Sequence, residues 1–142
     1  MNEDEVRNAG MAVRRQILGD AHVDRAVAIS SPLTKEFQDL FVRYGWGEIW
    51  TRPVLDHRDR TLLVIGTMLG IGRWEEFDMH VGAALRRGFP LVEIKEVIIQ
   101  QACYCGVPAA NTAFHRVQAV IDGLKAEGVA INGDGSGPGP KV

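Results

Sequence analysis

The sequence predicts an all-α protein, a single-domain helical bundle of about six helices. Apolar residues recur at helical spacing through most of the chain, and no segment alternates apolar and polar residues for long enough to indicate a strand. Glycine and proline residues fall between the periodic segments, where they end one helix and precede the next. A length of 142 residues fits one domain.

The first two expected helices are bounded by clear signals. The first covers about residues 3–18 and ends at Gly19, a residue type that is typical of helix C-termini. The second runs from about Thr34 to Trp50 and is stopped by Pro53. The segment Ser30-Ser31-Pro32 is interpreted as the linker between them.

The next helices follow with short connections. Asp56 is the expected N-cap of a helix through about Leu69, which is apolar on nearly every face and should therefore be central. The remaining expected helices span about 73–87, 91–105 and 108–125. We expect a helical domain at 1–128 and a mobile tail rich in glycine and proline at 129–142.

Charge and hydropathy exclude two classes of partner. The chain has 16 Lys plus Arg against 18 Asp plus Glu, so it offers no basic face, and we expect no nucleic-acid partner. The apolar stretch Leu62–Ile71 is interrupted and much shorter than the roughly 20 residues of a spanning helix, so we expect no membrane partner. The acidic N-terminus is not followed by an apolar run, which indicates a cytoplasmic protein without a secretory signal.

The cysteine and histidine spacings do not indicate a metal site. Cys103 and Cys105 are too close for an ordinary disulfide, and they match neither a thioredoxin-like motif nor a zinc site. The four histidines form no i, i+4 pair that would place two ligands on one helical face. We therefore expect no metal site.

Two titratable residues interrupt apolar stripes. Continuing the stripe of Phe37 and Tyr44 by helical steps leads to Glu48, and His80 lies within the stripe of the helix at about 73–87. We expect both side chains to face the interior, where burial disfavours an isolated charge. Each alone is more typical of a hydrogen-bonded core residue, but two such intrusions together favour a shared cleft.

Two further segments carry chemically useful side chains. Trp46, Trp50 and Arg52 lie within Trp46-Gly47-Glu48-Ile49-Trp50-Thr51-Arg52-Pro53, which either lines a pocket or anchors a helix end to the core. Tyr104 and Cys105 precede a turn of small residues that joins two helices closely. Cys105 is equally well explained as a small buried hydrophobic residue.

These segments carry a resemblance to a known family. The segment 46–53, then His80, Ala83-Ala84-Leu85 and Gly88, then Glu93-Ile94-Lys95-Glu96-Val97, then Tyr104-Cys105-Gly106-Val107-Pro108-Ala109-Ala110-Asn111 together resemble the carboxymuconolactone decarboxylases. The resemblance implies the all-α fold shared with alkylhydroperoxidase D, a homo-oligomer that is commonly a hexamer, and no cofactor. It implies loss of CO2 from a dicarboxylate lactone in protocatechuate degradation. Those peroxidases carry Cys-x-x-Cys, whereas this chain has Ala102 at the first cysteine position.

The implied reaction suggests roles for the candidate residues. We hypothesise that His80 is the general acid, that Glu48 orients it, and that the Tyr104 hydroxyl or the Trp46 indole N–H faces the developing oxyanion. An arginine should bind the carboxymethyl group of the dianionic substrate through two hydrogen bonds. Arg52 is the first choice, followed by Arg43 and Arg73, while Trp50 and Cys105 line the pocket.

Two hypotheses from other classes remain open. A thiol-dependent peroxidase or disulfide reductase on the same fold would use Cys103 and Cys105, although their spacing is wrong for that chemistry. A non-catalytic helical assembly module would tolerate apolar replacements of His80 and Glu48 with no effect beyond stability.

Overall fold

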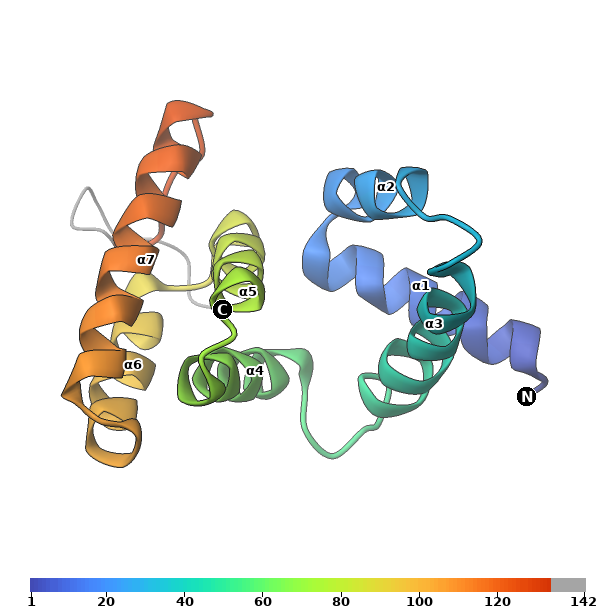
Figure 1. Cartoon of the computed structure of the whole chain (residues 1–142), viewed down its shortest axis with the longest axis horizontal. Coiled ribbons are helices and arrows are strands. Elements are labelled where there is room, and N and C mark those ends of the chain that lie inside the picture. The colour runs from blue at the N-terminus through green and yellow to red at the C-terminus, as the bar shows by residue number, and fades with distance from the viewer. Residues whose placement is uncertain (134–142) are drawn as a thin grey trace. The chain divides into compact units, whose positions relative to one another are not determined.

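The computed structural model describes residues 1–133. Within these residues the chain forms seven α-helices and one π-helix and contains no strand (Figure 1). The described residues separate after His57 into two compact units, which are treated one at a time below. The all-α prediction is confirmed.

The first unit begins with α1 (Glu3–Leu18), whose N-terminus carries a capping box. The Asn2 side chain accepts a hydrogen bond of 2.9 Å from the Glu5 backbone N–H, and the Glu5 carboxylate accepts one of 3.0 Å from the Asn2 backbone N–H. Gly19 ends the helix at φ 88°, a conformation that favours glycine. Both ends agree with the predicted helix.

A short helix, α2 (Asp20–Ala28), follows Gly19 directly and was not predicted. Val23 is the buried residue of this helix. Arg15 of α1 holds it by contacts of 3.1 Å to Asp20 and 2.9 Å to Asp24. Gly19 therefore ends one helix and precedes the next, whereas the sequence analysis took it only as a stop.

The predicted helix at 34–50 consists of α3 (Lys35–Phe41) and the π-helix η1 (Val42–Ile49). Hydrogen bonds in a π-helix span five residues, as between the Trp50 N–H and the Gly45 carbonyl at 3.0 Å. Val42 and Trp46 are buried against α1, with which η1 makes extensive contact. The packing depends on Gly10 of α1, because a Cβ there would lie 2.6 Å from the Gly47 backbone nitrogen.

The exposed face of α3 and η1 overturns two expectations about burial. Tyr44 and Glu48 are exposed, and the apolar stripe that was expected to face inward lies at the surface. Its members are Phe37, Leu40, Phe41 and Tyr44, with exposures of 63%, 51%, 43% and 56%. Phe37, Leu40 and Phe41 lie in α3, before the π-helix begins, so helical counting placed them on one face, but that face is exposed and not buried.

The second unit, from Arg58 onward, contains most of α4 (His57–Ile71), α5 (Trp74–Arg86), α6 (Leu91–Cys105) and α7 (Val107–Ala126). These bounds lie within two residues of the predicted ones. Helix α7 packs against both α5 and α6. The core includes Phe77, Val81 and Leu85 of α5, all fully buried. Helix α4 is less central than expected, because Leu63 is 57% exposed.

The segment that follows α7 packs against this core before the described residues end. Ile131 is buried, and the Asn132 side chain donates a hydrogen bond of 2.7 Å to the Gly88 carbonyl. The Asn132 carbonyl accepts another from the Leu91 N–H at 2.8 Å. Ile131 and Asn132, at the start of the predicted tail, therefore contact the second unit, and residues 134–142 of that tail lie outside the described residues.

Candidate active site

His80 occupies the middle of α5 and is 7% exposed. Its neighbours along the helix, Phe77, Val81 and Ala84, belong to the hydrophobic core, so packing fixes the backbone that carries the ring. The prediction that His80 faces the interior is confirmed. Imidazole changes its charge near neutral pH, which makes a buried histidine a strong candidate for a proton donor.

A carboxylate lies one helical turn before His80. Glu76 Oε1 accepts a hydrogen bond of 2.8 Å from Arg73 Nη2, whereas Glu76 Oε2 is buried and has no hydrogen-bond partner in the structure. The Arg73 hydrogen bond lowers the pKa of the Glu76 carboxyl below its ordinary value, and the charge of His80 acts in the same direction. Arg73 is therefore engaged by Glu76, and its predicted role in substrate binding stays a prediction.

The aromatic residues of the segment 46–53 form a cluster in the first unit. Trp46 is 3% exposed, and its ring lies 5.0 Å from that of Trp50 between centroids. The His57 ring is tilted relative to the Trp50 ring, with 6.1 Å between their centroids, and His57 Nε2 lies 3.2 Å from the Trp50 carbonyl oxygen. The Thr51 hydroxyl donates a hydrogen bond of 2.6 Å to the Gly47 carbonyl. The cluster anchors the end of η1 and places Trp50, which is partly exposed, beside an imidazole.

The charged residues predicted for this region lie at the surface of the first unit. Glu48 and Arg52 are exposed, so the expectation that Glu48 points inward is wrong. Arg43 is partly buried and lies 4.0 Å from the Glu3 carboxylate. The pairing of Glu48 with His80 involves residues of both units and stays a prediction.

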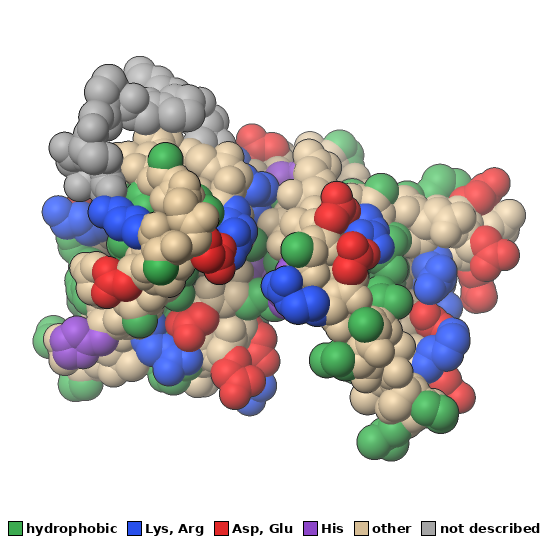
Figure 2. All heavy atoms as spheres, turned by 90° about the horizontal axis from the view of Figure 1, so that it is seen from above, with side chains coloured by type: hydrophobic (Ala, Val, Ile, Leu, Met, Phe, Trp, Pro, Cys, Tyr) green, Lys and Arg blue, Asp and Glu red, His purple; other side chains and the backbone are tan. Residues whose placement is uncertain are grey.

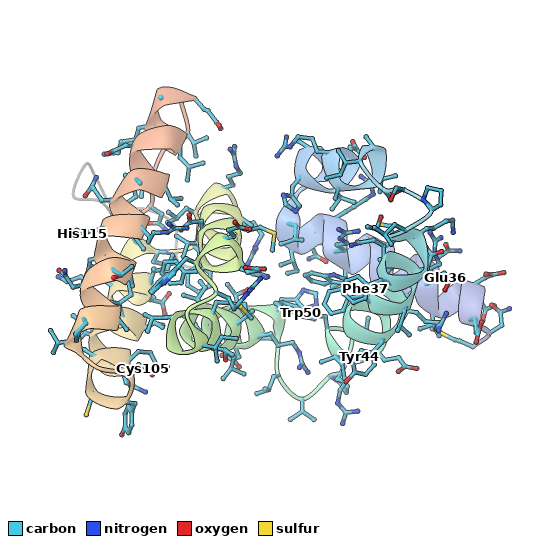
Figure 3. All side chains as sticks on the ribbon, in the orientation of Figure 1. Glu36, Phe37, Tyr44, Trp50, Cys105 and His115 are labelled. Atoms are coloured by element: carbon cyan, nitrogen blue, oxygen red, sulfur yellow. The ribbon has the colours of Figure 1, made fainter. Side chains whose placement is uncertain are left out.

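The residues at the end of α6 have different environments. Tyr104 is 79% exposed, and Cys103 is an exposed free thiol. Cys105, which is labelled in Figure 3, is partly buried and packs against the core. A Cβ added to Gly70 of α4 would lie 3.3 Å from the Cys105 sulfur, so the two positions are close together. This packing supports the interpretation of Cys105 as a small hydrophobic residue.

A groove of about 730 Å³ lies in the second unit between α4 and α6. Its lining combines apolar side chains with two carboxylates and three polar side chains: Leu62, Leu63, Gly66, Thr67, Glu93, Glu96, Val97, Ile99, Gln100 and Gln101. None of the predicted site residues lines this groove. It is therefore separate from the environment of His80.

Sequence reasoning missed Glu76 and His57. Both have a local signal: Glu76 precedes His80 by four residues on one helix, and His57 begins the helix that follows the tryptophan segment.

Among residues 1–133, no group of three or more His, Cys, Asp or Glu side chains is placed to hold a metal ion. No helix of the described part is long and apolar enough to cross a membrane. On the face shown in Figure 2, acidic and basic side chains are interspersed.

Comparison with known proteins connects these features to one family. Residues 35–119 match the Carboxymuconolactone decarboxylase family. A 4-carboxymuconolactone decarboxylase of Acinetobacter baylyi is 34% identical over 94% of this chain and all of the relative. The nitrosuccinic acid decarboxylase npaB of Metarhizium robertsii is 34% identical over 84% of this chain and 83% of the relative. A 4-carboxymuconolactone decarboxylase of Pseudomonas putida is 44% identical over 48 residues, which are 34% of this chain and all of the relative.

The matched region extends from α3 into α7 and contains His80, Glu76 and the tryptophan segment. The chain therefore belongs to the Carboxymuconolactone decarboxylase family.

Proposed function

We propose that the protein is a carboxy-lyase that converts 4-carboxymuconolactone to beta-ketoadipate enol-lactone in the cytoplasmic breakdown of protocatechuate. The observation that carries the proposal is the match to a 4-carboxymuconolactone decarboxylase along the whole length of that relative. The buried histidine on a rigid helix supplies the proton donor that the reaction requires.

The substrate itself supplies the electron sink. Its departing carboxylate is attached to a ring carbon that is conjugated with the lactone carbonyl, so the electrons left by CO2 delocalise onto the carbonyl oxygen. The enzyme must stabilise this oxyanion and protonate a ring carbon. These two tasks require no metal or organic cofactor.

The same demands arise with the substrate named in the second relative. Loss of the carboxylate next to the nitro group of nitrosuccinate leaves electrons that delocalise onto the nitro oxygens, and a carbon is then protonated. Both substrates are dicarboxylates with an internal electron sink. A conserved chemistry of this kind accounts for two decarboxylases with different substrates among the relatives.

The roles of individual residues follow from the chemistry. His80 donates the proton, and the Trp46 indole N–H or the Tyr104 hydroxyl serves the oxyanion. Arg52 stays the first candidate for the carboxymethyl group of the substrate, because the planar fork of a guanidinium binds a carboxylate through two hydrogen bonds. Arg43 and Arg73 follow it.

Decarboxylation and thiol chemistry predict opposite results for one experiment. Iodoacetamide treatment leaves CO2 release from 4-carboxymuconolactone within about twofold of the untreated rate, unless the group added to Cys105 fills the pocket that this residue is predicted to line, since the proposed mechanism uses no thiolate. The measurement is CO2 release before and after alkylation, with peroxide consumption followed in parallel. Consumption of peroxide that alkylation abolishes, without CO2 release, would instead support the peroxidase.

We also propose that the protein works as a homo-oligomer, with a hexamer as the expected form. The exposed row of Phe37, Leu40, Phe41 and Tyr44 supports self-association, because it forms one apolar stripe over α3 and η1. Phe37 and Phe41 stack at 6.4 Å between ring centroids, and Figure 3 labels Phe37 and Tyr44 along this segment. Burying this row against another copy would remove four large apolar side chains from water.

A charged residue in the row is expected to prevent assembly. Light scattering coupled to size-exclusion chromatography should give an oligomer for the wild type and a smaller species for Phe37→Asp. Val54→Asp is the matched control, since Val54 is 85% exposed and lies outside the row. A monomeric wild type, or an oligomer that Phe37→Asp leaves intact, contradicts this use of the row.

A further inference from the structure

We propose that Glu76 is the residue that positions His80 for proton transfer, with Glu76 Oε2 accepting a hydrogen bond from the protonated imidazole. The inference rests on the proposed function, in which His80 is the proton donor. It assigns to a carboxylate on the same helix the task that sequence reasoning gave to Glu48.

The two side chains share one face of α5. Residues separated by four positions are neighbours on a helix surface, so Glu76 lies directly before His80 along that face. Both are carried by the same rigid backbone, which is fixed by Phe77 and Val81 in the core. Glu48 belongs to a different compact unit and is exposed. Glu76 is thus the carboxylate whose placement near His80 is set by local geometry alone.

The two oxygens of the Glu76 carboxylate differ in their hydrogen bonding. Oε1 accepts the hydrogen bond from Arg73, which fixes the orientation of the carboxylate plane. Oε2 is buried and has no hydrogen-bond donor, although buried acceptors in folded proteins nearly always have one. An imidazolium one turn along the helix is the donor that such an oxygen requires. A carboxylate on one ring nitrogen also fixes the tautomer and directs the other nitrogen outward.

The Glu76 carboxylate is ionised at the pH at which protonated His80 acts as the general acid. The hydrogen bond from Arg73 lowers the pKa of Glu76, and His80 contributes in the same direction, so Glu76 is ionised at neutral pH. An interaction of two opposite charges is mutual, and Glu76 therefore favours the protonated form of His80. A general acid must start in that form.

Charges on the neighbouring element are balanced by partners of their own. Helix α7 packs against α5 and presents Arg116, which pairs with Asp78 at 2.8 Å. Beyond the end of α7, Glu127 pairs with Arg86 at 2.5 Å. Arg87, at the end of α5, donates a hydrogen bond of 3.0 Å to the Thr61 hydroxyl. Glu76 has an electrostatic interaction with His80.

A purely local role for Glu76 has to be distinguished from positioning. Glu75 and Glu76 both lie in the first turn of α5, where a negative charge stabilises the helix N-terminus. Glu75 also interacts electrostatically with Arg73. If Glu76 served only the helix, its loss would resemble the loss of Glu75. Glu75→Gln is therefore the matched control for Glu76→Gln, because each removes one charge and keeps the side-chain shape.

The test is an NMR titration of the His80 imidazole in the full chain. The four histidines are labelled with carbon-13, and His80 is assigned by the signal that is missing in His80→Gln. We expect Glu76→Gln to lower the pKa of His80 by roughly one unit, whereas Glu75→Gln lowers it by less than about 0.3 unit. Equal shifts in the two variants, or no shift in Glu76→Gln, would overturn the proposal.

Kinetics give a second readout. Glu76→Gln should lower kcat at pH 7 by about tenfold with KM unchanged within about twofold, and the limb of the pH profile set by the proton donor should move to lower pH. Glu76→Asp keeps the charge, so it should recover part of the His80 titration shift; no recovery in a folded variant contradicts a charge-based role. The titration needs no substrate, so absence of turnover by the wild type would refute the proposed function and leave the Glu76 assignment to be judged by the titration.

Discussion

Replacement of His80 by Ala lowers turnover of 4-carboxymuconolactone by about a hundredfold or more, the usual contribution of a positioned general acid. Without the imidazole, protonation of the ring carbon depends on water. Water is positioned less precisely than the buried His80 side chain. The measurement is kcat from CO2 release under saturating substrate. Turnover close to that of the wild type in a folded variant would remove His80 from the mechanism.

A second variant separates the loss of proton transfer from the loss of packing at position 80. Because His80 is 7% exposed, truncation to Ala also opens space in α5 and lowers stability. His80→Gln retains most of the volume and can donate a hydrogen bond, but it cannot donate a proton as imidazolium does. A similar loss of kcat in both variants therefore assigns the effect to proton transfer.

Replacement of Gly10 by Ala destabilises the first unit by about 3 kcal/mol, at the upper end of the range for overpacking. A Cβ at this position of α1 would lie 2.6 Å from the Gly47 nitrogen and 2.8 Å from the Gly47 Cα. Both atoms belong to the backbone of η1, so neither can move aside as a flexible side chain does. Denaturant unfolding followed by circular dichroism measures the change.

Gly123 provides the matched control. It is an exposed glycine within α7, and a Cβ there meets no heavy atom within 4 Å. Gly123→Ala should therefore stabilise the protein by roughly 0.5–1 kcal/mol, the ordinary gain in helix propensity. If Gly10→Ala is as well tolerated as Gly123→Ala, then α1 and η1 do not pack as closely as described.

The helices that sequence reasoning predicted best are those with strong punctuation. Helix α1 ends before Gly19 and α6 lies between Pro90 and Gly106, and both have the predicted bounds. Helix α2 was missed because it follows Gly19 directly, where the sequence predicts only the end of a helix. Local sequence also gives no sign that hydrogen bonding changes to the π pattern at Val42.

Of the two titratable residues that were expected to face the interior, His80 was placed correctly and Glu48 was not. His80 lies in a regular α-helix, so counting by helical steps placed it correctly in the interior. Glu48 continues the stripe of Phe37 and Tyr44, but that stripe is exposed, so helical counting grouped these residues without showing that their face is buried. Glu76 was overlooked because a carboxylate in the first turn of a helix has an ordinary structural explanation. Its buried oxygen is visible only in the folded chain.

The central claim is the identity of the substrate, and a comparison of two substrates tests it most directly. We would measure kcat/KM for 4-carboxymuconolactone, generated in situ, and for nitrosuccinate, with protein treated with a chelator. The wild type should release CO2 from the lactone and form the enol-lactone, with at least a hundredfold preference over nitrosuccinate, because a site built for a ring and its lactone carbonyl fits an open chain poorly. Preference for nitrosuccinate, or no CO2 release from the lactone by folded protein, would contradict the account.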